Sequence, residues 1–96
     1  MANEMTASKD LAVEMEALVR DMIKPLLNDP RELSVKAVRL TGRITIEVET
    51  SQDDVQYVLG RGASNMKAIR QLMKAYSGRY GIKIEVDYVT DRMTRS

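Results

Sequence analysis

The 96-residue sequence contains no cysteine and no histidine. Without cysteine the chain can form neither a disulfide framework nor a thiolate site, and this composition is typical of proteins from reducing compartments. No histidine is available as a general base, and no serine stands in a pattern that would activate it as a nucleophile. We therefore expect no enzymatic activity, no bound metal and no cofactor.

Long apolar runs are also missing. The first 23 residues have acids spread among their apolar positions, so they match neither a signal peptide nor a membrane span. The chain has only two prolines and five glycines, and its hydrophobic fraction is 44%, which is ordinary for a folded protein. We expect one cytoplasmic domain that does not enter a membrane.

Charge is unevenly distributed along the chain. The formal net charge is only +1, but residues 55–84 contain bases and no acid. These bases are Arg61, Lys67, Arg70, Lys74, Arg79 and Lys83. Such a local excess of positive charge within a balanced chain indicates a surface that attracts anions.

The first predicted helix covers residues 9–27. Its apolar residues recur at helical spacing, and charged residues fill the opposite face. Ser8 is expected to cap its start. Pro30 is expected to end it, because a proline disfavours helical geometry in the residue before it.

Two further helices are predicted on either side of a glycine pair. Ser51 is expected to cap the first of them, with the acids at 53–54 next to its positive end, and this helix runs to about Leu59. The second covers residues 64–77 and is expected to close at Gly78 and Gly81. Together with the first helix, these segments supply three apolar stripes for a core.

Alternation of apolar and polar residues predicts three strands. Residues 35–50 form two of them, joined as an antiparallel hairpin at Thr41-Gly42, and residues 82–89 form the third. The element order is therefore α-β-β-α-α-β. This order predicts an α+β domain with a three-stranded sheet and helices packed on one face.

The segment GRGA, residues 60–63, joins the second and third predicted helices. A short glycine-rich turn brings backbone N–H groups to a helix N-terminus, where the helix dipole favours an anion such as phosphate. Arg61 and Lys67 stand where acids would stabilise the isolated helix. This conflict between local stability and sequence favours a phosphate clamp over a simple helix-breaking turn.

Lys67, Arg70 and Lys74 follow the loop on a helical stripe about 60° wide. Taken alone, such a stripe is more often a solvated helix face than a binding site. Its position directly after the glycine-rich loop favours binding.

The segment DDVQYVLGRGASNMKAIRQLMKAYSGRYGIKIEVDYV resembles the helix–loop–helix–strand half of a type II KH domain. Its most specific part is VLG, followed seven residues later by KAIR. The chain is most similar to small bacterial RNA-binding proteins made of one KH domain. The resemblance implies a type II KH-like domain over residues 9–89 with loose tails at 1–8 and 90–96, and a role as an RNA chaperone in post-transcriptional regulation.

The resemblance also implies the site. It predicts that the loop contacts the sugar-phosphate backbone of single-stranded RNA, over about four nucleotides, while nearby cations add charge and apolar side chains form a groove for bases. The implied RNA-binding residues are Gly60, Arg61, Gly62, Ala63, Ser64, Lys67, Arg70, Val58 and Leu59, with Ile69 as a further groove residue.

The loop departs from the family pattern at one position. The family reads Gly-x-x-Gly, whereas GRGA has Ala63 in the last place and an additional glycine at Gly62. The methyl group of Ala63 stands where the phosphate backbone is expected to approach. An alternative therefore stays open, in which the KH fold serves as a protein-interaction module. The partner would be a second copy of the chain or another RNA-binding protein.

Overall fold

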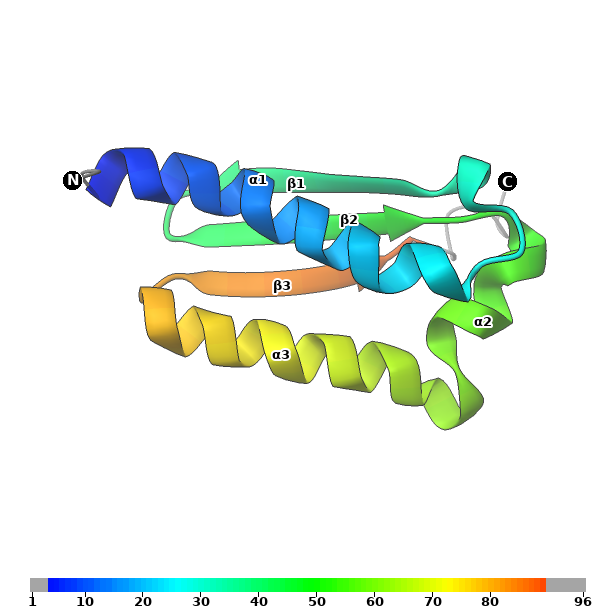
Figure 1. Ribbon diagram of the computed structural model, residues 1–96. Helices are drawn as coiled ribbons and strands as arrows, with labels where there is room; N and C mark the ends of the chain where they lie inside the picture. The colour runs from blue at the N-terminus through cyan, green and yellow to red at the C-terminus, as the bar shows by residue number, and fades with distance from the viewer. Residues whose placement is uncertain (1–3, 90–96) are drawn as a thin grey trace.

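The helices and strands follow one another in the predicted order (Figure 1). The computed structural model describes the backbone of residues 4–89 and the side chains of residues 11–89. Its elements are α1 (Glu4–Ile23), β1 (Ser34–Leu40), β2 (Arg43–Glu49), α2 (Val55–Leu59), α3 (Ser64–Tyr80) and β3 (Lys83–Tyr88). Short 3-10 turns lie between them at η1 (Lys24–Leu26), η2 (Pro30–Glu32), η3 (Gln52–Asp54) and η4 (Arg61–Ala63).

The three strands form one mixed sheet in the order β1-β2-β3. β1 and β2 are antiparallel, with Val35 opposite Val48, and the hairpin between them turns at Gly42 with a φ of 70°. β3 is parallel to β2, with Ile84 beside Ile44. A parallel pair needs a crossover connection, and α2 and α3 supply it.

Alternate strand residues face the helices and form the core. The buried strand residues are Val35, Ile44, Ile46, Val48, Ile84 and Val86. They belong to one cluster with residues of the helices, namely Leu11, Met15, Val19 and Ile23 of α1, Val58 of α2, and Met66, Ile69 and Met73 of α3. Because all the buried strand residues share one sheet face, the helices cover that face. The predicted α+β class with helices on one side is confirmed.

The first helix differs from its prediction at both ends. It begins at Glu4, so Ser8 lies inside it and does not cap it, and residues 4–8 are helical. It ends at Ile23, four residues before the predicted end, because Pro25 has no N–H to donate to the preceding turn and restricts the residue before it. The predicted tail at 90–96 lies outside the described residues.

The start of α2 also differs from its prediction. Ser51 makes no side-chain capping hydrogen bond. Asp54, which is 1% exposed, instead accepts hydrogen bonds from the backbone N–H groups of Asn28 at 3.1 Å and Asp29 at 2.9 Å. Asp54 thus ties α2 to the turn that precedes β1. In the same turn, the hydrogen bond from Arg31 lowers the pKa of the exposed Asp29 carboxyl.

The end of α3 lies three residues beyond the predicted last residue, Ser77. The helix continues to Tyr80 and ends at Gly81, whose φ is 68° and whose N–H donates to the Ser77 carbonyl at 2.9 Å. Only Gly81 has the left-handed conformation that terminates a helix, whereas Gly78 is helical. Of the two glycines that were predicted to close the helix, Gly81 does so and Gly78 does not.

Side chains of α1 protect the free edge of β1. Glu16 Oε1 accepts the Ala37 N–H at 2.8 Å, and Arg20 donates to the Val35 carbonyl at 3.0 Å and to Glu16 at 3.2 Å. These bonds occupy backbone groups that would otherwise pair with a strand of another chain. No helix among residues 4–89 is both long and apolar enough to cross a lipid bilayer.

Candidate nucleic-acid interface

The GRGA loop is a tight turn that separates α2 from α3. Gly60 and Gly62 both have positive φ angles, 76° and 61°, and the Ala63 N–H donates to the Gly60 carbonyl at 3.0 Å. Glycine adopts this conformation without steric cost. The predicted break between two helices is confirmed, and it brings Arg61 and Gly62 to the exposed surface.

Gly60 is required by its surroundings as well as by its φ. A Cβ atom at this position would lie 2.7 Å from the Asn65 Cγ and 3.0 Å from the Asn65 backbone nitrogen. Asn65 is held there because its Nδ2 donates to the Tyr57 carbonyl at 3.0 Å, which satisfies a carbonyl in the last turn of α2. Sequence reasoning missed Asn65, since its partner lies in another helix.

Ala63 adopts a left-handed conformation with a φ of 61°, which no other non-glycine residue among residues 4–89 shares. An L-residue with a Cβ is destabilised by about 1–2 kcal/mol in this region. The place where the family pattern has glycine is thus a place where the backbone itself favours glycine. Ala63 is also the N-cap residue of α3 and makes no side-chain capping bond.

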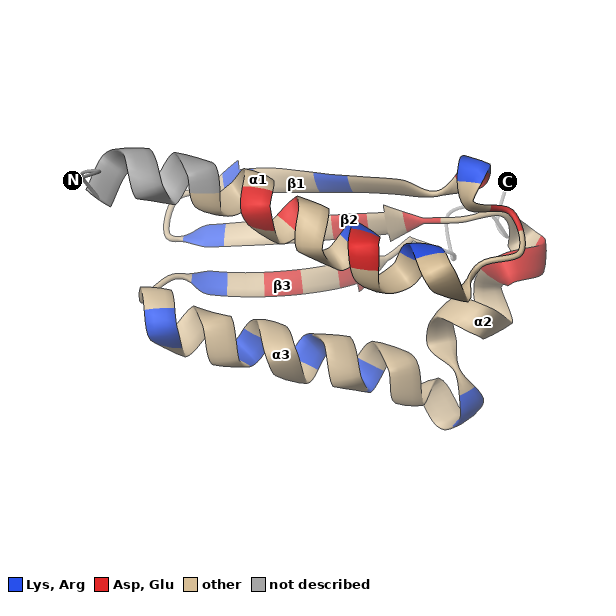
Figure 2. Ribbon diagram, viewed as in Figure 1, with Lys and Arg blue, Asp and Glu red and all other residues tan. Residues whose placement is uncertain are grey.

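The loop and α3 carry basic residues and no acidic residue (Figure 2). Ion pairs on the described part of the chain include those of Arg20 with Glu16, of Arg31 with Asp29, and of both Arg43 and Lys83 with Glu85. None of these pairs involves Arg61, Lys67 or Lys74, and all three side chains are exposed. Within the acid-free stretch, Arg61, Lys67 and Lys74 are therefore exposed cations outside these ion pairs, whereas Lys83 is paired with Glu85.

Most of the predicted site residues come together around the first turn of α3. Gly60 to Ser64 form the loop and the helix start, and Lys67 follows one turn later. Arg70 lies a further turn along, where its Nε donates to the Val86 carbonyl of β3 at 3.1 Å. Part of the Arg70 guanidinium thus holds the edge of the sheet.

The apolar part of the predicted site needs a correction. Val58 is 0% exposed and belongs to the core, so its side chain cannot contact RNA. Ile69, at 5% exposure, is also a core residue, and Leu59 is half-buried against the same cluster. Helical spacing placed Val58 and Ile69 on the correct face of their helices but could not show that this face points entirely inward. Among the described side chains, no group of three acids could hold a metal ion.

Comparisons with known proteins identify the family of the chain. A family model described as the KH domain of KhpA and KhpB matches residues 16–88. RNA-binding protein KhpA of Chlamydia caviae is 27% identical over 78 residues, which cover 81% of this chain and 100% of that protein. RNA-binding protein KhpA of Mycobacterium bovis is 31% identical over 75 residues, covering 78% of this chain and 91% of that protein.

One solved structure shares the fold. The crystal structure of Aquifex aeolicus Era bound to GDP and AlF4⁻ superposes with a TM-score of 0.53 at 14% identity. The match covers 81% of this chain but only 30% of Era, and it carries information on the fold alone. The family match spans the loop and all three strands, and it confirms the predicted resemblance. The chain therefore belongs to the KhpA/KhpB family of KH domains.

Proposed function

We propose that this chain binds single-stranded RNA without catalysing a reaction, and that the GRGA loop grips the sugar-phosphate backbone of about four nucleotides. Relatives named RNA-binding protein KhpA support RNA as the ligand. The observation that carries the proposal is the exposed, unpaired positive charge of Arg61 and Lys67 at the start of α3. There the helix dipole adds to their attraction for phosphate.

The roles that we propose for these residues follow from the hydrogen bonds of the loop. The N–H groups of Ala63 and Ser64 donate within the turn, to the carbonyls of Gly60 and Arg61. A phosphate would therefore be held mainly by the side chains of Arg61, Ser64 and Lys67, with the small residues at 62 and 63 allowing close approach. A site with so few charges gives modest affinity and a shallow dependence on salt.

The test uses charge reversal in the loop. Arg61→Asp combined with Gly62→Asp should abolish binding of labelled single-stranded RNA in fluorescence anisotropy. A Cβ at Gly62 meets no atom within 4 Å, and Asp tolerates positive φ better than most residues. Arg61→Asn combined with Gly62→Asn has the same backbone demands without the acids, and it should retain part of the affinity.

A control reverses a charge elsewhere. Lys36 lies on the outer face of the sheet, so Lys36→Glu should leave the RNA affinity unchanged. If the double-aspartate variant keeps its native circular-dichroism spectrum and binds RNA with the affinity of the unaltered protein, the loop is not the site.

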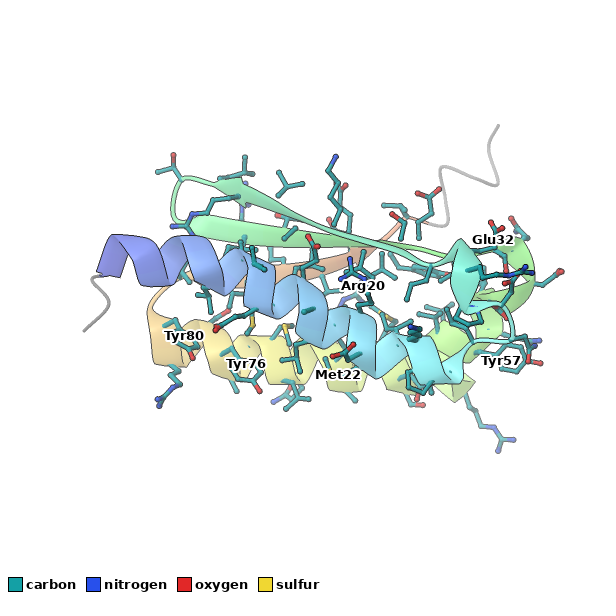
Figure 3. The ribbon with its side chains drawn as sticks, turned by 45° about the horizontal axis from the view of Figure 1, so that its top comes forward. Arg20, Met22, Glu32, Tyr57, Tyr76 and Tyr80 are labelled. Carbon is teal, nitrogen blue, oxygen red and sulfur yellow. The ribbon has the colours of Figure 1, made fainter. Side chains whose placement is uncertain are left out.

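A second candidate function is self-association or docking of another RNA-binding protein. α3 exposes apolar side chains at intervals of four residues: Leu72 and Tyr80 are each 47% exposed, and Tyr76 is half-buried. Figure 3 shows Tyr76 and Tyr80 next to each other along α3. A homodimer through this face would join two weak RNA sites and raise the overall affinity.

This second function is tested by Leu72→Glu, which should shift a dimer to monomer in analytical ultracentrifugation. A protein that is monomeric at all concentrations before the substitution would contradict self-association.

RNA binding at the loop and association through α3 would both suit a cytoplasmic RNA chaperone acting in post-transcriptional regulation, which is the cellular role we propose.

A further inference from the structure

Ser64, the first residue of α3, carries a hydroxyl that the fold does not use. The residue is exposed, and its Oγ makes no hydrogen bond with the described part of the chain. Its backbone N–H donates to the Arg61 carbonyl, which places Ser64 in the turn at the surface. The hydroxyl is therefore accessible to an enzyme that modifies serine.

The other described serines lack this combination of features. Ser34 lies within β1, opposite Glu49 of β2. Ser51 is partly buried and is followed by two acids at positions 53–54. Ser77 is partly buried, and its Oγ already donates one hydrogen bond and accepts another. Ser64 is thus the described serine that combines exposure, a hydroxyl free of hydrogen bonds and a basic neighbourhood.

Two cations flank Ser64 in the sequence. Arg61 precedes it by three residues and Lys67 follows it by three, and both side chains are exposed and outside the ion pairs described above. Lys67 is a neighbour of Ser64 on the helix surface, and Arg61 shares its turn. The oxygens of a phosphate on Ser64 could accept charge-assisted hydrogen bonds from both. Positive charge beside a serine is also a pattern by which kinases distinguish their substrates.

The segment around Ser64 is suited to local opening, which a kinase needs in order to hold the serine in its own active site. Segments with few stabilising contacts open at a lower free energy than the core of a helix. Ala63 has a φ of 61°, and the start of α3 has no side-chain cap. The first turn of α3 should therefore open more easily than the middle of the helix, where Met73 is buried.

We propose that Ser64 is a phosphorylation site and that its phosphate switches off RNA binding at the loop. The enzyme is a serine/threonine kinase and the donor is ATP. The Ser64 Oγ attacks the γ-phosphorus of ATP, the bond from that phosphorus to the β–γ bridging oxygen breaks, ADP leaves, and the hydroxyl proton passes to the catalytic base of the kinase. The inference rests on the proposed RNA binding by the loop and adds its regulation.

The phosphate should have opposite effects on stability and on RNA affinity. Phosphoserine carries a charge of about −1.5 to −2 at pH 7. The first turn of α3 contains no acid, so this charge stabilises the positive end of the helix. The same charge pairs with Arg61 and Lys67 and repels the phosphates of an incoming RNA. Damage to the loop, in contrast, would lower stability and affinity together.

The first test uses protein in which phosphoserine is incorporated at position 64 during translation. In anisotropy titrations, its affinity for single-stranded RNA should fall, and the slope of log affinity against log salt should decrease by about 0.7 for each of the two cations that the phosphate occupies. Its Tm should rise by about 2–6 °C. Treatment with a phosphatase should restore both the affinity and the Tm of the unmodified protein. Thr41→Glu adds an acid to the exposed hairpin turn and, as the matched control, should not change the affinity.

A second measurement reports the contact between the phosphate and the cations. The second pKa of a free phosphoserine is about 6, and cations beside the phosphate lower this pKa because they favour its dianion. A titration followed by ³¹P NMR should therefore give a lower pKa for the phosphate on Ser64. Arg61→Gln combined with Lys67→Gln should bring this pKa back to about 6.

The kinase step is tested on the unmodified protein with ATP and an arginine-directed serine/threonine kinase. Mass spectrometry of the product should locate a phosphate on Ser64, and Arg61→Gln should lower its yield. Absence of phosphate at Ser64 after this reaction would overturn the inference.

Two results with the phosphoserine protein would also overturn the inference: RNA binding equal to that of the unmodified protein while the double-aspartate loop variant does not bind, or a fall in Tm together with the fall in affinity. Failure of the loop proposal has a different signature. The double-aspartate variant and the phosphoserine protein would then both bind RNA with unchanged affinity, although the phosphate would still raise the Tm.

Discussion

Replacing Ala63 with glycine should stabilise the protein. Ala63 has a φ of 61°, and a Cβ in this left-handed region is destabilising by about 1–2 kcal/mol. Glycine removes that strain, but it also makes the unfolded chain more flexible, which offsets about 0.5–1 kcal/mol of the gain. The net stabilisation should be about 0.5–1 kcal/mol, which for a domain of this size raises Tm by about 2–8 °C.

Two other exchanges between glycine and alanine provide matched controls. Gly62 has the same φ of 61°, and a Cβ there would meet no atom within 4 Å. Gly62→Ala should therefore be destabilising by an amount similar to the gain from Ala63→Gly. Gly78 lies inside α3 with open space around it, so Gly78→Ala should stabilise the helix by about 0.5–1 kcal/mol.

The assay is urea unfolding followed by circular dichroism, combined with RNA titration of each variant. If Ala63→Gly lowers the free energy of unfolding while Gly62→Ala leaves it unchanged, backbone strain does not govern the loop and the reasoning fails. Ala63→Gly also tests the departure of the loop from the Gly-x-x-Gly pattern of the family. If the methyl group obstructs approach of the RNA backbone, affinity should rise with Ala63→Gly.

Three further substitutions test other parts of the structure. Gly60→Ala should destabilise the protein by about 2–3 kcal/mol, because alanine is strained at the positive φ of this position and its Cβ would break the Asn65 hydrogen bond. Thermal melts of Gly60→Ala, Asn65→Ala and the double variant should give non-additive changes in stability. Full additivity would contradict a steric clash between Asn65 and a Cβ at position 60. Asp54→Ala leaves two backbone N–H groups without their acceptor and should lower the free energy of unfolding by about 1–3 kcal/mol in urea, whereas an unchanged midpoint would show that water replaces the carboxylate. Lys67→Glu should raise the stability of α3 by about 0.3–1 kcal/mol through the helix dipole yet weaken RNA binding in anisotropy; unchanged RNA affinity would remove Lys67 from the site.

Hydrophobic periodicity predicted the order of the elements and the β-hairpin because both depend on residues close in sequence. Its failures have a common cause. The end of α1 depends on the missing N–H of Pro25, and the end of α3 depends on which glycine has positive φ. Both are properties of single backbone positions that a periodic pattern averages away.

The side chains that sequence reasoning missed or misassigned depend on contacts outside their own helix. Asp54 accepts hydrogen bonds from residues 25 and 26 positions earlier, and Asn65 contacts a carbonyl in the preceding helix. Val58 lies on a helix of five residues, too short for its pattern to separate a buried position from a groove position. The basic residues were easier to place, since exposure is the default for lysine and arginine.

The loop combines three local features that each lower stability: a positive φ at Ala63, a helix start without a side-chain cap, and a first turn without an acid. A missing cap alone costs about 1 kcal/mol relative to Ser, Thr, Asp or Asn. An Asp at the N-cap or a Glu in the first turn would stabilise the helix start, but either would place a carboxylate where a phosphate is expected to lie. A glycine at position 63 would remove the strain without adding charge. The acid-free helix start is therefore the feature that the proposed RNA binding at the loop would explain directly, whereas the proposed binding does not require the strain at Ala63.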